Sequence, residues 1–207
     1  MSTSRDPVAT KRGYHHGDLK AAALEAARVQ LGERGAEDIS LREVARAAGV
    51  SATALYRHFP DKAALLEALS EEGFARLAAA QRAAMEGATG TRVDQFNAMG
   101  RAYVRFALAE PGLFRLMFTH TPKYDALTVD LAKAHSSLQM LRAAAAELVP
   151  PGRGAAAAQL FALRAWSLVH GLALLLLDQQ VEAEDAMVDA VIDMRDFGME
   201  AAALSRS

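Results

Sequence analysis

The segment "SLREVARAAGVSATALYRHFPDK", residues 40–62, decides the fold of this chain. Ser40 and Glu43 have the spacing of a capping box, in which a hydroxyl and a carboxylate close the start of a helix. Ser51 starts a second helix just after Gly49, and glycine is the commonest residue at helix ends. Two short helices joined by such a turn have the dimensions of a helix-turn-helix.

The helix expected from Ser51 to Phe59 has an inward and an outward face. Leu55 and Phe59 lie four residues apart and are expected to point into the core. The outward residues are Ala52, Thr53, Tyr56 and Arg57. If this helix enters a DNA major groove, its first turn meets base edges, which makes Ala52 and Thr53 candidates for base reading.

The same segment concentrates groups that suit a phosphate backbone. Tyr56, His58 and Lys62 supply hydroxyl, imidazole and ammonium donors. The helix starts at Ser40 and Ser51 offer free N–H groups and the positive end of a helix dipole. The alternative is that Tyr56 and His58 cap the edge of the core and that Lys62 is a solvated charge.

The stretch "AALEAARVQLGERGAEDISLREVARAAGVSATALYRHFPDKAALLEAL" resembles the DNA-binding domain of the TetR (tetracycline-repressor) family. The segment "YHHGDL", residues 14–19, is similar to the entry of the first helix in one branch of that family. The resemblance implies an N-terminal DNA-binding domain over residues 14–62.

The resemblance also implies roles for individual residues. Ser40, Tyr56, His58 and Lys62 match positions that contact phosphate in the family, and Ala52 and Thr53 occupy its variable base-reading positions. Ala52 is smaller than the residue that many members carry there. We therefore expect Arg57 or Arg42 to take more of the base readout.

Residues 1–13 form a basic arm that we expect to be flexible. Its Lys11 and Arg12 have two alternatives: contact with DNA, in the minor groove or on phosphate, or a disordered tail. His15 and His16 are adjacent and have no carboxylates beside them, so we expect no metal site.

The rest of the chain has helical periodicity nearly throughout, and the expected fold is all-α with about nine helices. The helices are expected at residues 18–34, 40–49, 51–59, 61–85, 92–109, 113–118, from the break at 120–124 to 148, at 155–177 and at 184–204. Residues 63–207 then form a second domain for effector binding and dimerisation.

The last two helices are broadly apolar, which predicts burial against more than one neighbour. A two-fold dimer is the natural partner for such a surface. The expected interface residues are Leu163, Trp166, His170, Leu174, Leu177, Val188, Val191, Ile192 and Arg195. The stretches "AWSLVHG", 165–171, and "YVRFALAEPGLFRLMF", 103–118, resemble the WHG class of C-terminal domains in the same family.

Large, adaptable side chains gather on the central helices, and a pocket lined by such residues is typical of a site for small molecules. The candidates are Met99, Tyr103, Phe106, Phe114, Met117, Phe118, Met140, Trp166 and His170. The alternative is a plain hydrophobic core.

Other classes of function find little support. The chain has no cysteine, and we find no paired nucleophile and base, no metal cluster and no cofactor motif, so no catalytic residue is assigned. The apolar stretch at 160–177 is interrupted by Arg164 and His170, which favours a buried or interface helix over a membrane span. We expect a cytoplasmic protein.

The sequence thus predicts a homodimeric transcription regulator, a repressor that binds a palindromic operator in double-stranded DNA. A small apolar effector of unknown identity would release it. Two alternatives remain: a DNA-binding architectural protein without an effector, and an enzyme built on a helical dimer.

Overall fold

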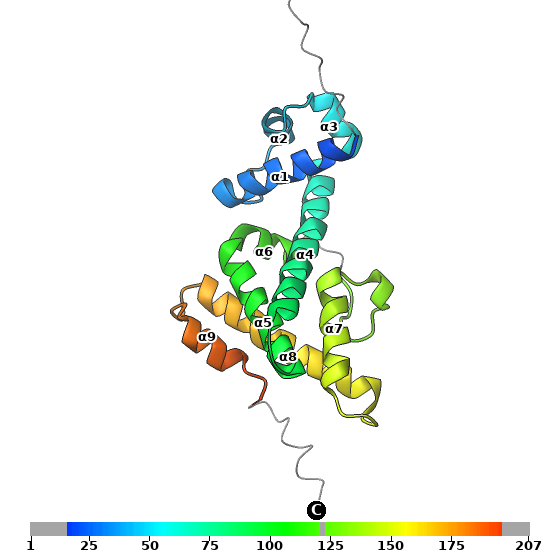
Figure 1. Ribbon diagram of the computed structural model, residues 1–207. Helices are drawn as coiled ribbons and strands as arrows, with labels where there is room; N and C mark the ends of the chain where they lie inside the picture. The colour runs from blue at the N-terminus through cyan, green and yellow to red at the C-terminus, as the bar shows by residue number, and fades with distance from the viewer. Residues whose placement is uncertain (1–15, 121–122, 196–207) are drawn as a thin grey trace, which may run out of the picture.

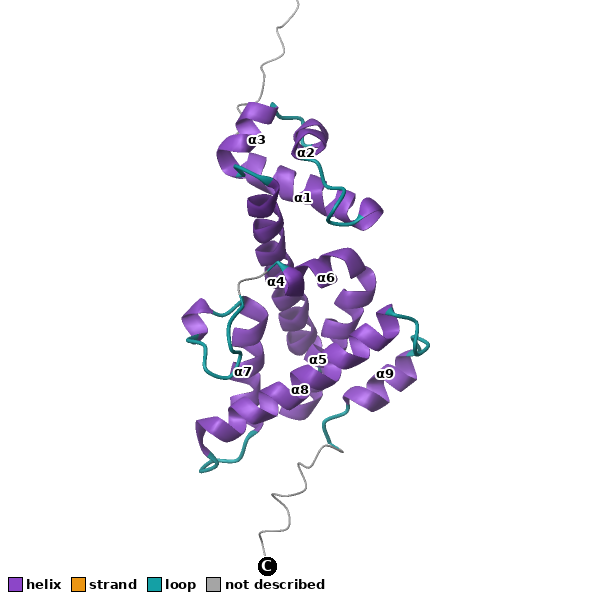
Figure 2. Ribbon diagram, turned by 180° about the vertical axis from the view of Figure 1, so that it is seen from behind, coloured by secondary structure: helices purple, strands orange, loops and turns teal. Residues whose placement is uncertain are grey.

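The computed structural model of the protein describes residues 16–120 and 123–195, and within these ranges it is all-helical with no strand (Figures 1 and 2). The helices are α1 His16–Arg34, α2 Leu41–Ala47, α3 Ala52–His58, α4 Lys62–Gly87, α5 Arg92–Ala109, α6 Pro111–Thr119, α7 Ser136–Leu148, α8 Gly154–Leu177 and α9 Asp185–Ile192. A single 3₁₀ turn, η1, covers Leu131–Lys133. The nine expected α-helices are all present in this part of the chain.

The small N-terminal unit consists of α1, α2 and α3, which pack around one cluster of buried side chains. Leu55 and Phe59 lie in that cluster, as their spacing predicts. The Ser51 hydroxyl accepts a hydrogen bond from the Ala54 N–H at 3.1 Å and so caps α3. The Asp61 carboxylate does the same for α4, accepting from the Ala64 N–H at 2.8 Å. These two expected caps are confirmed.

The capping box expected at Ser40 is wrong. Ser40 is the N-cap residue of α2, but its side chain makes no capping hydrogen bond. Glu43 instead forms ion pairs with Arg34, at 2.8 Å, and with Arg46, at 3.8 Å. The carboxylate is therefore used to join α2 to the end of α1 rather than to close its own helix.

The long helix α4 connects the N-terminal unit to the larger helical assembly (Figure 1). Its Leu65 and Leu69 belong to the same buried cluster as Leu55, and this cluster continues to Phe114 of α6. Helix α6 also packs directly against α1. The N-terminal unit is thus tied to the larger domain at two places, α4 and α6.

The last helix is shorter than expected. The period of the sequence predicts a helix over 184–204, but α9 ends at Ile192, and residues 196–204 lie outside the described part of the chain. Asn97 explains the end: its side chain donates to the Asp193 carboxylate at 2.8 Å and accepts from the Met194 N–H at 3.1 Å. These bonds turn the chain inward, and Met194 is buried.

Three other boundaries also differ from expectation, and the largest difference is at α7, which starts at Ser136 rather than directly after the break at 120–124. Helix α1 starts at His16, two residues before the Asp18 cap that the sequence suggests. Helix α6 starts at Pro111, because proline fits the first turn of a helix, where its missing N–H leaves no hydrogen bond unmade.

Among the described helices, α8 is long and apolar enough to cross a membrane by length and composition, with a mean hydropathy of 1.8. It packs against α5 and α7 within the chain. This packing agrees with the expected buried or interface helix.

Candidate DNA-binding face and effector cavity

The outer face of α3 presents the residues that the sequence assigns to DNA. Ala52, Thr53, Tyr56 and Arg57 are exposed, together with the Ser51 cap. The Tyr56 side chain is large and apolar in its ring, yet 43% of its surface is accessible. Neither Tyr56 nor Arg57 makes a side-chain hydrogen bond or ion pair within the described part of the chain. These two side chains are therefore available for a partner.

The remaining DNA candidates are placed differently. Arg42 is exposed on α2. Lys62 is half-buried, and its ammonium donates a hydrogen bond to the backbone carbonyl of Glu37, in the connection between α1 and α2. An ammonium has three donors, so this bond leaves two for a phosphate.

His58 is also half-buried, with its ring 6.5 Å from that of Phe59. Ser40 is half-buried at the start of α2. Lys11 and Arg12 of the basic arm lie outside the described residues. The structure thus places the candidates of α2 and α3 on one unit and leaves the arm undescribed.

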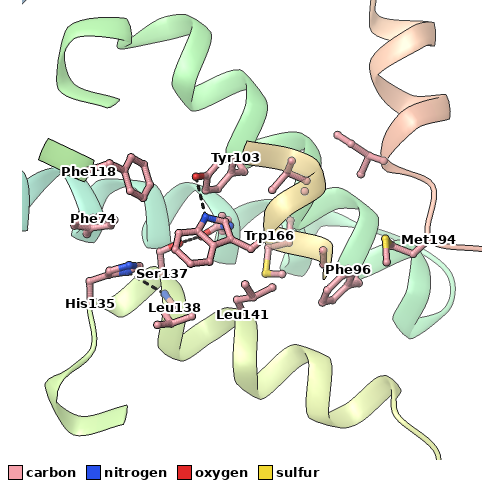
Figure 3. Close-up of a pocket in the computed structure, with 16 residues that line it drawn as sticks. Phe74, Phe96, Tyr103, Phe118, His135, Ser137, Leu138, Leu141, Trp166 and Met194 are labelled. Atoms are coloured by element: carbon pink, nitrogen blue, oxygen red, sulfur yellow. Dashed lines mark hydrogen bonds between the residues drawn. The ribbon is translucent and has the colours of Figure 1, made fainter. Parts of the chain in front are cut away.

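A cavity of about 30 Å³ lies between α4, α5, α7 and α8 (Figure 3). Its lining is largely aromatic and aliphatic. The lining residues are Phe74, Gln81, Phe96, Met99, Gly100, Tyr103, Phe118, His135, Ser137, Leu138, Leu141, Ala165, Trp166, Val169, Ile192 and Met194. A cavity of this volume has room for one or a few water molecules, so a larger guest must push the walls apart.

Four of the expected pocket residues, Met99, Tyr103, Phe118 and Trp166, line this cavity. The other five do not. Phe114 and Met117 are fully buried in the core shared by α4 and α6. Phe106 lines an open groove between α4 and α5. Met140 packs on the buried cluster that includes the lining residues Phe96 and Met99, and His170 is hydrogen-bonded to the Tyr103 hydroxyl.

The Tyr103 hydroxyl joins two helices through a chain of hydrogen bonds. It accepts from the Trp166 indole N–H at 3.2 Å and forms a hydrogen bond with the His170 Nδ1 at 2.8 Å. Burial raises the pKa of Tyr103 and lowers the pKa of His170. All three groups are consequently uncharged at neutral pH, and the chain links α5 to α8.

Sequence reasoning named His135 as a possible polar group of the pocket but missed the two other polar members of the lining, Ser137 and Gln81. Ser137 of α7 donates its hydroxyl hydrogen to the Gln81 side-chain oxygen of α4 at 2.7 Å, and both residues are buried. His135 precedes α7, and its Nδ1 accepts the Leu138 N–H at 3.1 Å. The His135 ring stacks on Phe74 with centroids 3.7 Å apart. Burial lowers the pKa of His135 to about 4, so this ring is also neutral.

Several residues expected at a dimer interface are used inside the chain instead. Val188 and Ile192 of α9 are buried against α5 and α8. Trp166 lines the cavity, and Arg195 pairs with Asp94 and Asp193. The reason is that α9 packs against its own protomer, so the apolar side chains of α9 are already buried within the chain.

The other five expected interface residues, Leu163, His170, Leu174, Leu177 and Val191, are half-buried. The exposed apolar side chains of α8 are Leu160, 51% accessible, and Leu175, 47% accessible. Gly171 lies on the same face, and a methyl group added to it would touch no other residue of the chain. This face is therefore open over its whole length.

In the described part of the chain, no three His, Cys, Asp or Glu side chains cluster closely enough to hold a metal ion. The arrangement offers an exposed donor-bearing helix at one end and an uncharged cavity at the other.

Comparison with known proteins agrees with this division. Residues 23–69 match the family model "Bacterial regulatory proteins, tetR family", and residues 96–195 match "Tetracyclin repressor-like, C-terminal domain". The chain is 33% identical over 93 residues to the nucleoid occlusion factor SlmA of Haemophilus influenzae. That match spans 45% of this chain and 42% of SlmA.

Solved structures cover more of the chain. A protein of unknown function from Rhodococcus sp. RHA1 is 32% identical to this chain and superimposes with a TM-score of 0.70. The match covers 93% of this chain and 98% of the Rhodococcus chain. A TetR variant of Acinetobacter baumannii AYE in complex with minocycline is 21% identical, with a TM-score of 0.59. The two share 90% of this chain and 96% of that one, which shows the same fold. The chain belongs to the TetR family, a family of regulators and not of enzymes, and it is a DNA-binding transcriptional regulator.

Proposed function

We propose that the protein is a homodimeric repressor whose affinity for a palindromic operator falls when a small, uncharged molecule enters the cavity. The observation that carries this proposal is the layout of α4. Its first residue, Lys62, borders the DNA-binding unit, and its Phe74 and Gln81 line the cavity. One rigid helix thus joins the two sites.

The proposed DNA contacts divide by chemistry. Tyr56, His58 and Lys62 would bind phosphate and set the position of the domain, whereas Thr53 and Arg57 would read bases. A selection from random duplex DNA tests this division. Thr53→Ala should change the selected sequence, and an unchanged consensus would assign base reading to Arg57 or Arg42.

The proposed dimer uses the open face of α8 rather than the stripe that the sequence suggests. Leu160 and Leu175 supply apolar area near its two ends, and Gly171 allows a second helix to approach closely. The Trp-His-Gly pattern of the WHG class then has a divided role here: Trp166 and His170 face inward, and Gly171 faces the partner. We accordingly propose that the C-terminal domain belongs to the WHG class.

Sedimentation tests the dimer. Leu175→Glu should shift the protein from dimer to monomer at micromolar concentration and weaken operator binding, because each half-site would be bound separately. Leu131→Glu, the same chemical change at an exposed leucine outside α8, tests whether any added carboxylate suffices. A wild-type monomer that still binds a palindrome tightly would contradict the proposal.

Small-molecule control is supported by the cavity and by the minocycline complex of the Acinetobacter relative, which has the same fold. The protein would act in the cytoplasm, where the operator is. A screen for compounds that lower operator affinity tests the effector role. By linkage, operator DNA must weaken binding of a true effector by the same factor.

The small volume of the cavity favours a second candidate, a DNA-binding protein without an effector. In that case the cavity holds water only, and no compound that enters it changes operator affinity. The reciprocal binding experiment distinguishes the two.

A further inference from the structure

Gln81 has an unused donor in the cavity wall. This residue of α4 is only 3% exposed. Its side-chain oxygen accepts the Ser137 hydroxyl at 2.7 Å, which leaves the amide NH₂ group. Within the described part of the chain, no hydrogen-bond acceptor pairs with that NH₂ group, and Gln81 lines the cavity. A donor in the cavity wall that has no acceptor in the protein favours a guest that supplies one.

His135 adds a second donor to the same region. Its Nδ1 accepts the Leu138 N–H, so the proton of the neutral ring is on Nε2. No acceptor among the described residues pairs with this Nε2–H. Stacking on Phe74 fixes the plane of the ring. Figure 3 shows His135 and Ser137 on one side of Trp166, whereas Phe96 and Met194 lie on the other.

Other polar groups of the lining are already satisfied or absent. The Tyr103 hydroxyl is already hydrogen-bonded to both Trp166 and His170. No lining side chain is charged at neutral pH, because burial keeps His135 neutral. A charged guest would lose its hydration without gaining a counter-charge, which is strongly unfavourable.

We propose that the cavity takes an uncharged, largely apolar or aromatic molecule with one oxygen acceptor, such as a ketone, aldehyde or ester carbonyl. The oxygen accepts hydrogen bonds from the Gln81 amide and the His135 Nε2–H, and the apolar body extends past Trp166 toward Phe96. This inference rests on the proposed effector role and specifies the chemistry of the effector.

Three probes of nearly equal size test the proposal: acetophenone, α-methylstyrene and benzoate. The first has a carbonyl oxygen, the second a methylene group in its place, and the third a charged carboxylate. Because the sizes match, the cost of widening the cavity is nearly the same for all three. Ligand-observed NMR titration should give acetophenone an affinity at least about tenfold above the other two, the effect expected of a buried hydrogen bond.

Variants locate the contact. Gln81→Leu should lower acetophenone affinity by about tenfold and leave α-methylstyrene unchanged. Gln95→Leu makes the same chemical change on α5 outside the lining and should alter neither. His135→Asn keeps an acceptor for the Leu138 N–H and removes the ring N–H. This variant provides a second test if Gln81→Leu does not fold, which thermal unfolding will show.

The outcomes separate the two proposals. Equal binding of acetophenone and α-methylstyrene, tighter binding of benzoate, or no binding of any probe at millimolar concentration would overturn the assigned ligand chemistry. Selective binding that depends on Gln81 but leaves operator affinity unchanged would support that chemistry and refute the effector role. Operator release by a compound whose binding does not depend on Gln81 or His135 would support the effector role and refute the assigned ligand chemistry.

Discussion

The joint between α1 and α6 leads to a quantitative prediction. The Arg28 guanidinium makes two hydrogen bonds to the Glu110 carboxylate, at 2.6 and 2.9 Å, across the boundary between the N-terminal unit and the larger domain. The two side chains are only 24% and 29% exposed. Both bonds come from the single Nη1 nitrogen of Arg28, whereas Nη2 and Nε bind Glu25. Because the pair is charge-assisted and partly buried, we expect a coupling of about 1 kcal/mol, at the upper end of the 0–1 kcal/mol typical of surface pairs.

Urea unfolding of a double-mutant cycle measures this coupling. The variants are Arg28→Met, Glu110→Gln and the double variant, and an unchanged m-value shows that each folds to a comparable extent. The coupling should also fall as salt is added, because the pair is partly exposed. A coupling below about 0.3 kcal/mol would place the pair with ordinary surface contacts and would refute its contribution to the joint between α1 and α6.

Glu25 shares Arg28 and adds a pH dependence to the same prediction. The hydrogen bond from Arg28 is the main reason that the pKa of Glu25 is lowered from 4.5 to about 2. A carboxyl group with a lowered pKa stabilises the fold above its unfolded pKa and loses that effect as pH falls. The stability difference between wild type and Arg28→Met should therefore shrink between pH 4.5 and pH 2.

Three further outcomes are expected. The pKa of His135 is lowered to about 4 in the folded protein. As pH falls below about 6.5, this histidine is therefore protonated in the unfolded chain before it is protonated in the folded protein. Wild type should then lose up to about 3 kcal/mol of stability between pH 6.5 and 4 relative to His135→Asn, which calorimetry checks. Gly73→Ala would place a methyl 2.7 Å from Met117 Cγ and should cost about 1–3 kcal/mol in urea unfolding, whereas Gly32→Ala, with open space around it, should cost nothing. Lys62→Ala should weaken DNA binding equally across sequences and reduce the salt slope by about 1; a changed sequence preference with the slope intact would contradict a phosphate contact.

Local signals in the sequence predict the local features of the fold. The caps at Ser51 and Asp61 depend on atoms three residues away, and both are confirmed. The Ser40 cap fails because Arg34, on another helix, pairs with Glu43. Short-range rules cannot include such a partner.

The cavity shows the same limit more clearly. Apolar residues such as Met99 and Trp166 were recognisable by type, but Gln81 reads as a surface residue until Ser137, 56 positions later, is brought against it. The chemistry of histidine makes His135 a candidate polar group from the sequence alone, but its stacking on Phe74 is a contact between distant parts of the chain. These contacts arise only when α4, α7 and α8 are packed together, so the hydrogen-bonded pair of Gln81 and Ser137 could not be predicted.

The length of α4 has a geometric consequence for release from DNA. At 1.5 Å per residue, Lys62 and Gln81 are about 28 Å apart along the helix. A tilt of about 5° around the cavity end would move the Lys62 end by about 2.5 Å. In the proposed two-fold dimer the two displacements add to about 5 Å, which exceeds the rise of about 3.4 Å per base pair. A guest that widens the cavity slightly can thus put the two recognition helices out of step with consecutive major grooves, while every DNA-contacting side chain keeps its place within its own domain.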